Sequence, residues 1–273
     1  MYKYLLILFL MTTHLLASNQ NDLINIKTKV SKGIVKVKML ILSPMRGAEK
    51  VKKGNKQDYI NHISVRVGNY IVYDASLSEN LKSNPIIEFE YPFKNRGKTL
   101  EFITTNNQGK KSHQTKKIKY TPSLKQPYIG SSKEQSFINY RDIKPDLWKN
   151  KTVNEAIVEL YGHTETINGK IEICSTPKGP YHVVTINVRA KVLLESLLIL
   201  TDANPSPVVA VFQTTSDALV GYKVPISMLK SGYGHIVVIG KGLDGKLYKT
   251  SHRVKVWTAS CDGGGDNEVI CHY

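Results

Sequence analysis

The sequence predicts an all-β protein with two tandem immunoglobulin-like antiparallel β-sandwich domains and one short helix at the start of the second domain. Three observations support this prediction. Many short runs alternate apolar and polar residues, which is the period-2 pattern of half-buried strands. Turn residues separate these runs at regular intervals, as in β-sandwiches. The two halves of the chain also resemble each other.

The first half contains five runs of this kind. They cover residues 33–42, 62–75, 86–91, 99–105 and 116–121. "GNY" at 68–70 divides the second run into a hairpin, and "NNQG" at 106–109 forms a turn between the last two. We therefore assign residues 24–121 to the first sandwich domain.

A polar segment with three prolines follows the first domain, and we interpret residues 122–149 as a linker. After it, residues 152–162 predict a short helix. Thr152 and Glu155 have the spacing of a capping box, and Gly162 supplies a stop signal. One face of this helix is apolar and is expected to pack on its own sandwich; it consists of Val153, Ala156, Ile157 and Leu160.

The second half repeats the strand pattern, and we assign residues 150–257 to the second sandwich domain. Its predicted strands cover residues 181–190, 195–202, 207–215, 234–242 and 253–257. Residues 99–120 align with residues 235–256 without a gap, since both read strand, turn with Gly, Lys and a final basic strand. Tandem copies of one sandwich type explain this repeat.

The first 18 residues have the pattern of a secretory signal peptide. Lys3 precedes an apolar run from Tyr4 to Met11, and the small residues Ala17 and Ser18 mark the expected cleavage site. The apolar run is much shorter than the ~20 residues that span a bilayer. We therefore expect an exported, periplasmic protein with no membrane contact after cleavage.

Positive charge is concentrated in the first half. Residues 21–125 contain 21 Lys and Arg against 8 Asp and Glu, whereas residues 126–273 contain 16 against 14. No nucleic-acid motif accompanies this charge, so nucleic acid is the least favoured partner. Two interpretations remain open for the exposed lysines: they steer acidic partners or anions, or they form a solvated surface. The lysines in question are Lys50, Lys52, Lys53, Lys56, Lys110, Lys111, Lys116, Lys117 and Lys119.

The chain has three cysteines, and two lie in the segment "TASCDGGGDNEVICHY" at 258–273. Cys261 stands beside three glycines in what we expect to be a flexible arm, and Cys271 lies ten residues further on. Both are candidate sites of thiol chemistry, and a disulfide between them is an open alternative. Cys174 falls in an apolar strand pattern at 170–177 and is expected to be a buried core residue.

Several stretches resemble the bacterial Sox sulfur-carrier complex. Residues 25–121 resemble its Z subunit through "KGIVKVKMLILSPMRG" (32–47), "YINHISVRV" (59–67) and "ENLKSNPIIEFEY" (79–91). Residues 150–262 resemble its Y subunit through the helix, "LLILTDANPSPVVAVFQ" (197–213) and a last strand leading into "VKVWTASCDGGG" (254–265). The sequence thus resembles a fusion of two normally separate subunits.

The resemblance implies a covalent carrier rather than an enzyme. In that family a cysteine in a glycine-rich arm holds thiosulfate-derived sulfur, and Cys261 matches its position. The implied partners are a c-type haem sulfur transferase, a metal-dependent hydrolase that releases sulfate, and a sulfane dehydrogenase; no permanent cofactor is implied. Ala259, Ser260 and Asp262 replace the family's glycines next to the cysteine, and the chain runs past the arm, which puts standard docking in doubt.

Other functions remain open from the residues alone. Cys271 and His272, with Cys261, Asp262 or Asp266, supply ligand types that suit copper or zinc, although their spacing matches no closed zinc motif. A disulfide-stabilised scaffolding protein also fits the strand pattern. An ordinary enzyme is least supported, because the sequence has no phosphate-binding loop, nucleophile elbow or paired-His motif.

Overall fold

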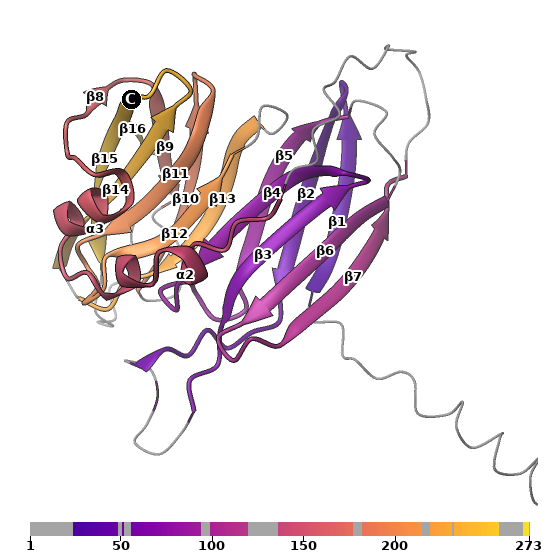
Figure 1. Cartoon of the computed structure of the whole chain (residues 1–273), viewed down its shortest axis with the longest axis horizontal. Coiled ribbons are helices and arrows are strands. Elements are labelled where there is room, and N and C mark those ends of the chain that lie inside the picture. The colour runs from indigo at the N-terminus through magenta and orange to yellow at the C-terminus, as the bar shows by residue number, and fades with distance from the viewer. Residues whose placement is uncertain are drawn as a thin grey trace, which may run out of the picture.

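A computed structural model describes residues 24–48, 51, 56–93, 99–119, 136–176, 182–214, 219–230, 232–256 and 270–272. The fold is a two-sheet sandwich, antiparallel except for the pair β15–β8, whose first half and second half lie side by side (Figure 1). The predicted all-β class is therefore confirmed.

The described part of the first half forms seven strands. They are β1 (Ile24–Ser31), β2 (Ile34–Ile41), β3 (Ile60–Val67), β4 (Tyr70–Leu77), β5 (Ile86–Pro92), β6 (Thr99–Asn106) and β7 (Lys111–Lys117). In β2, for example, Val35, Val37, Met39 and Ile41 are fully buried, whereas Lys36 and Lys38 face solvent. The same alternation gives β1, β5 and β6 one core face. The central strands β3 and β4 are instead buried along nearly their whole length.

The described residues of the second half form three helical segments, followed by nine strands. The helical segments are α2 (Tyr140–Ile143), the 3-10 helix η2 (Pro145–Lys149) and α3 (Val153–Tyr161). The strands are β8 (Ile167–Asn168), β9 (Ile171–Thr176), β10 (Val183–Ala190), β11 (Leu194–Thr201), β12 (Val208–Gln213), β13 (Leu219–Ser227), β14 (Gly232–Gly242), β15 (Leu247–Val256) and β16 (Ile270–His272).

Both sheets run through the two halves without interruption. One sheet has the order β1-β2-β5-β13-β10-β9-β16, and the other has the order β7-β6-β3-β4-β12-β11-β14-β15-β8. Antiparallel pairs β5–β13 and β4–β12 make the junction. The two sandwich units therefore share their sheets edge to edge, which the tandem-domain prediction did not anticipate.

The strand order also explains the repeat seen in the sequence. In the nine-stranded sheet, β3 lies between the junction strand β4 and the hairpin β6–β7. In the same way, β11 lies between the junction strand β12 and the hairpin β14–β15. The aligned segments 99–120 and 235–256 thus occupy equivalent places on either side of the junction. The halves meet through equivalent edges, as two subunits of a symmetric dimer do.

Four aromatic rings fill the core at the junction, one from each strand that forms it. Tyr73 on β4 stacks on Phe89 of β5 with ring centroids 4.6 Å apart, and Phe212 on β12 stacks on Tyr222 of β13 at 4.4 Å. Tyr73 also meets the rings of Phe212 and Tyr222 edge to face at 5.8 and 5.7 Å. All four side chains are fully buried. This cluster joins the halves through a hydrophobic interior of the kind found in permanent interfaces.

Residues 136–149, within the predicted linker, are ordered and bind to β4 of the first half. The amide of Ile138 donates to Asp74 Oδ2 at 2.8 Å, and the amide of Tyr140 donates to Ser76 Oγ at 2.8 Å. The Arg141 guanidinium donates twice to the carbonyl oxygen of Leu77, at 3.1 and 2.8 Å. The segment that precedes the second sandwich is therefore fastened to the first one.

Helix α3 confirms the predicted capping. Thr152 accepts a hydrogen bond from the Glu155 amide, the Glu155 carboxylate accepts one from the Thr152 amide, and Gly162 adopts the left-handed C-cap conformation with φ 85°. Ala156 and Ile157 are buried against Leu198 and Leu200 of β11 in a second, smaller core. Among the described residues, no helix has the length and apolar character needed to cross a bilayer.

Candidate functional site: the outer face of the seven-stranded sheet

The expected arm lies outside the described residues over most of its length. This holds for Cys261, for the glycines that follow it, and for the predicted signal peptide with Ala17 and Ser18. The backbone of residues 270–272 is described and forms β16, whereas the side chains of Cys271 and His272 are not.

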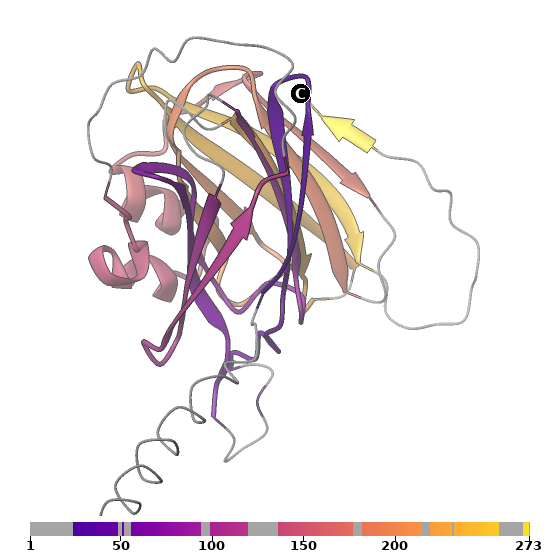
Figure 2. The ribbon, with the colours of Figure 1, turned by 90° about the vertical axis from the view of Figure 1, so that its right-hand side faces the viewer.

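Strand β16 pairs with β9 in antiparallel register and is the last strand of the seven-stranded sheet (Figure 2). Ile270 lies opposite Ser175, Cys271 opposite Cys174, and His272 opposite Ile173. The chain thus passes from β15 in one sheet to β16 in the other.

Cys174 does not occupy the core, and the expectation that it does was wrong. On β9 the buried side chains are Ile171, Ile173 and Ser175, so Cys174 projects to the opposite, outer face together with Glu172 and is half-buried. Cys174 is disulfide-bonded. The Glu172 carboxylate lies 3.8 Å from its sulfur. The period-2 pattern already contained this information, because Ile171 and Ile173 occupy the alternate positions that face the core.

One row of directly opposed residues crosses the outer face from edge to edge. It consists of Lys27, Lys38, Glu88, Lys223, Asn187, Cys174 and Cys271 on β1, β2, β5, β13, β10, β9 and β16. Directly opposed residues on neighbouring antiparallel strands share a face of the sheet. The row therefore links the cationic first half to the cysteine pair at the far edge.

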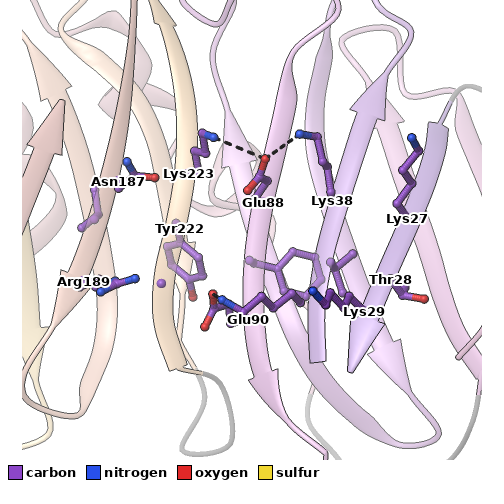
Figure 3. A pocket seen from close by; sticks show the side chains of 15 residues that line it. Lys27, Thr28, Lys29, Lys38, Glu88, Glu90, Asn187, Arg189, Tyr222 and Lys223 are labelled. Atoms are coloured by element: carbon purple, nitrogen blue, oxygen red, sulfur yellow. Dashed lines mark ion pairs between the residues drawn. The ribbon is translucent and has the colours of Figure 1, made fainter. Parts of the chain in front are cut away.

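A groove with a volume of about 350 Å³ lies along this face and spans the junction between the halves (Figure 3). We call it the basic groove. Six cationic side chains line it against the two carboxylates of Glu88 and Glu90; the cationic residues are Lys27, Lys29, Lys36, Lys38, Arg189 and Lys223. The excess of positive charge makes the groove suitable for anions.

Ion pairs in the basic groove engage some of its cations. Lys38 and Lys223 contact Glu88 at 3.0 and 3.5 Å, as the dashed lines in Figure 3 show, and Lys36 contacts Glu90 at 2.8 Å. Partial burial raises the pKa of Glu88, but the two lysines outweigh it and bring the pKa below its ordinary value. Glu88 is thus ionised at neutral pH. Within the described part of the chain, Lys27, Lys29 and Arg189 have no ion-pair partner.

The lysines singled out in the sequence lie elsewhere. Lys111, Lys116 and Lys117 are exposed on β7, the edge strand of the nine-stranded sheet, where lysine prevents pairing with another chain. Lys50, Lys52 and Lys53 lie outside the described residues. Sequence reasoning missed Lys223 and Arg189, because only the pairing of β13 with β5 brings them beside the basic strands of the first half.

A buried polar contact joins β9 to β15 in the other sheet. Ser175 Oγ lies 2.7 Å from His252 Nε2 on β15, and both side chains are buried. This contact connects the two sheets directly beneath the position where β16 adds to β9. It fixes the strand that carries Cys174.

No group of three or more His, Cys, Asp or Glu side chains within metal-binding reach occurs among the residues whose side chains are described. The candidate metal ligands Cys261, Asp262, Asp266, Cys271 and His272 lie outside that set.

Comparisons with known families match each half separately. Residues 24–117 match the family model described as sulphur oxidation protein SoxZ, and residues 177–261 match the family model described as sulfur oxidation protein SoxY. The second match ends at Cys261. No curated relative matches the chain.

Two solved structures are similar to the chain at low superposition scores. The sulfur carrier protein SoxY from Chlorobium limicola f thiosulfatophilum has 23% identity and a TM-score of 0.34, and the match covers 42% of this chain and 98% of that one. Fibronectin(III)-like modules of Clostridium thermocellum CbhA have 9% identity and a TM-score of 0.24, with coverage of 90% and 100%.

Proposed function

Because the chain belongs to the SoxZ and SoxY families, whose domains it carries in tandem, we propose that it is a periplasmic sulfur carrier with Cys261 as the attachment site. One observation carries the proposal: the SoxY match runs to residue 261, so the cysteine belongs to the matched region. The carrier itself performs no turnover and presents its cargo to separate enzymes.

The chemistry requires an accessible thiolate. The Cys261 thiolate joins the outer sulfur of thiosulfate in a two-electron oxidation, which forms one S–S bond and passes both electrons to the haem of a partner protein. Hydrolysis of the resulting adduct by a metal-dependent partner releases sulfate and leaves a persulfide on Cys261. A sulfane dehydrogenase then oxidises that sulfur.

The position of Cys261 along the chain suits this role. Val256 ends β15, and the cysteine follows five residues later, which gives a reach of about 17 Å at ~3.3 Å per residue. Gly263, Gly264 and Gly265 permit backbone angles that other residues avoid. A partner's active site can therefore receive the sulfur at a distance from the rigid sandwich.

The basic groove supports a role for charge in partner recognition. Its six cations against two carboxylates favour an acidic partner surface on the outer face of the seven-stranded sheet. Both halves contribute to the groove, so the pairing of β5 with β13 creates this surface.

Intact-mass analysis of the purified chain after treatment with thiosulfate and the haem partner tests the proposal. We expect a mass increase of one thiosulfate group, and we expect Cys261→Ser to abolish it. A double variant, Cys174→Ser with Cys271→Ser, is the matched control and should still be loaded. An adduct that survives in Cys261→Ser would contradict the assignment. Stoichiometric copper or zinc in the purified protein, lost on substitution of Cys271 and His272, would favour a metal-binding module instead.

A further inference from the structure

We infer that Cys174 and Cys271 form a disulfide that fastens the chain after Cys261 to the edge of β9. The cysteine segment is then a loop closed at both ends, between β15 and β16, rather than an arm anchored only at β15. The consequence for Cys261 rests on the proposed function, whereas the bond itself follows from the state of Cys174 and the register of β16.

The sulfur of Cys174 is bonded to the sulfur of another cysteine. The chain contains only two other cysteines, Cys261 and Cys271. The partner is therefore one of these two.

The register of β9 and β16 identifies Cys271 as the bonding partner of Cys174. Cys271 lies directly opposite Cys174 in the antiparallel pair β9–β16. Opposed residues in such a pair have Cα atoms about 4.5 to 5.5 Å apart. A disulfide requires about 4.4 to 6.8 Å, so this register meets the requirement without movement of the backbone.

The position of Cys174 on β9 places the bond on the outer face of the sheet. Its side chain faces outward and is half-buried, with Asn187 opposite it on β10 and Cys271 opposite it on β16. The bond therefore lies on the outer face of the sheet, next to a residue that lines the basic groove. A reductant or thiol can reach it there, whereas a bond in the core would be shielded.

The bond forms by a two-electron oxidation of the two thiols. The two thiols give up two protons and two electrons. A disulfide-bearing oxidant accepts the electrons: one thiolate attacks the oxidant to form a mixed disulfide, and the other then displaces the oxidant's thiol.

The bond has two consequences for a carrier. Cys271 is occupied, so it neither protects Cys261 nor competes with it for sulfur. The fixed position of β16 also limits the conformations of residues 257–269, which lowers the entropy lost when a partner binds the loop. Reduction removes this restraint and releases β16 from β9.

Peptide mapping of the full-length chain, purified without reductant and treated with iodoacetamide, tests the bond. Trypsin alone leaves Cys261 and Cys271 on one peptide, because no Lys or Arg follows Lys255; a second cut after Glu268 by a Glu-specific protease separates them. We expect a linked pair that contains Cys174 and Cys271, with the alkyl group on Cys261. A link from Cys261 to either other cysteine, or alkylation of Cys174 and Cys271, would overturn the inference.

Hydrogen exchange tests the effect on the strand. We expect the amides of residues 270–272 to exchange at least tenfold faster in the Cys174→Ser/Cys271→Ser variant than in the wild type. Cys261→Ser is the matched control and should retain both the link and the slow exchange. Equal exchange in the double variant and the wild type would refute the tether. A linked Cys174–Cys271 pair in a protein that takes up no sulfur would leave the inference intact and refute the carrier function.

Discussion

At the scale of single residues, two buried tyrosine hydroxyl groups at the junction are unsatisfied in hydrogen bonding. The hydroxyl groups of Tyr73 and Tyr222 are buried and have no hydrogen-bond partner among the described residues. A buried donor without a partner costs about 1 to 3 kcal/mol of stability. The rings, in contrast, fill the core shared by the two halves.

We therefore expect Tyr73→Phe to leave the free energy of unfolding unchanged or to raise it by about 1 kcal/mol. The substitution keeps the stacked ring and removes the unpartnered hydroxyl. Urea denaturation measures the difference. A loss of more than about 1 kcal/mol would show that the hydroxyl is stabilising.

Asp74 makes stability depend on pH. Burial raises its pKa above the ordinary value, against hydrogen bonds from His62 at 2.6 Å and from the Ile138 amide that lower it. A raised pKa means that the folded state holds its proton more tightly than the unfolded state. The contribution of Asp74 to stability is thus full below its unfolded pKa of about 3.9 and is lost as the pH rises through the folded value.

We expect Asp74→Asn to remove this contribution. Denaturation curves of the variant and the wild type between about pH 4 and pH 7 should then differ in slope, with the wild type losing more stability as the pH rises. Parallel pH profiles would contradict the assignment to Asp74.

At the scale of elements, Arg141 makes several of the contacts that hold α2. Arg141 lies 3.8 Å from the centroid of the Trp148 ring and donates twice to the Leu77 carbonyl, and it contacts Glu79 at 3.4 Å. Burial lowers the pKa of its guanidinium, while Tyr59 and Glu79 oppose that change. The arginine joins the segment before α3 to β4.

Arg141→Ala should lower the free energy of unfolding by about 1.5 to 3 kcal/mol, because a charge-assisted double hydrogen bond and a ring contact are lost. Lys149→Ala is the matched control, since its ion pair with Asp146 is exposed and should contribute less than about 1 kcal/mol. Thermal denaturation compares them, and equal effects would contradict this view of α2.

The tether of β16 contributes stability as well. The bond between Cys174 and Cys271 closes a ring of roughly 100 residues, which corresponds to about 4 to 5 kcal/mol in the chain-entropy model. Dithiothreitol should therefore lower the melting temperature of both the wild type and Cys261→Ser. A melting temperature that is insensitive to reductant would count against the bond.

Local patterns predicted most elements. The run at 86–91 became β5, the hairpin at 62–75 became β3 and β4, and Thr152 with Glu155 capped α3 as expected. Strands β1, β8, β13 and β16 were not predicted. β13 is stabilised by pairing with β5 and β10, and β8 and β16 have only two and three residues. The outward position of Cys174 was readable from Ile171 and Ile173, but its bond depends on a strand pairing that local patterns do not encode.

At the scale of the whole molecule, the two matched halves are continuous through their sheets. The junction pairs β5–β13 and β4–β12 enclose the four aromatic rings, and the basic groove crosses the same junction. The segments matched by the two family models thus form one continuous structural unit. The tandem order of the halves was visible in the sequence, whereas their edge-to-edge union depends on long-range pairing.

We expect the chain to unfold in one cooperative transition rather than two. Calorimetry should give equal calorimetric and van't Hoff enthalpies. Phe212→Ala should cost about 3 to 5 kcal/mol and lower the single transition, because its ring packs on strands of both halves. Two separate transitions in the wild type would contradict a shared core.

Locating the sulfur adduct on the chain shows whether Cys261 is the carrier residue. The chain is loaded with thiosulfate and the haem partner and then cut after Lys255 and after Glu268. We expect the added sulfur on the peptide 256–268, with Cys174 still linked to Cys271. Sulfur found on the peptide 269–273, or no adduct on any peptide while the partner is active, would contradict it.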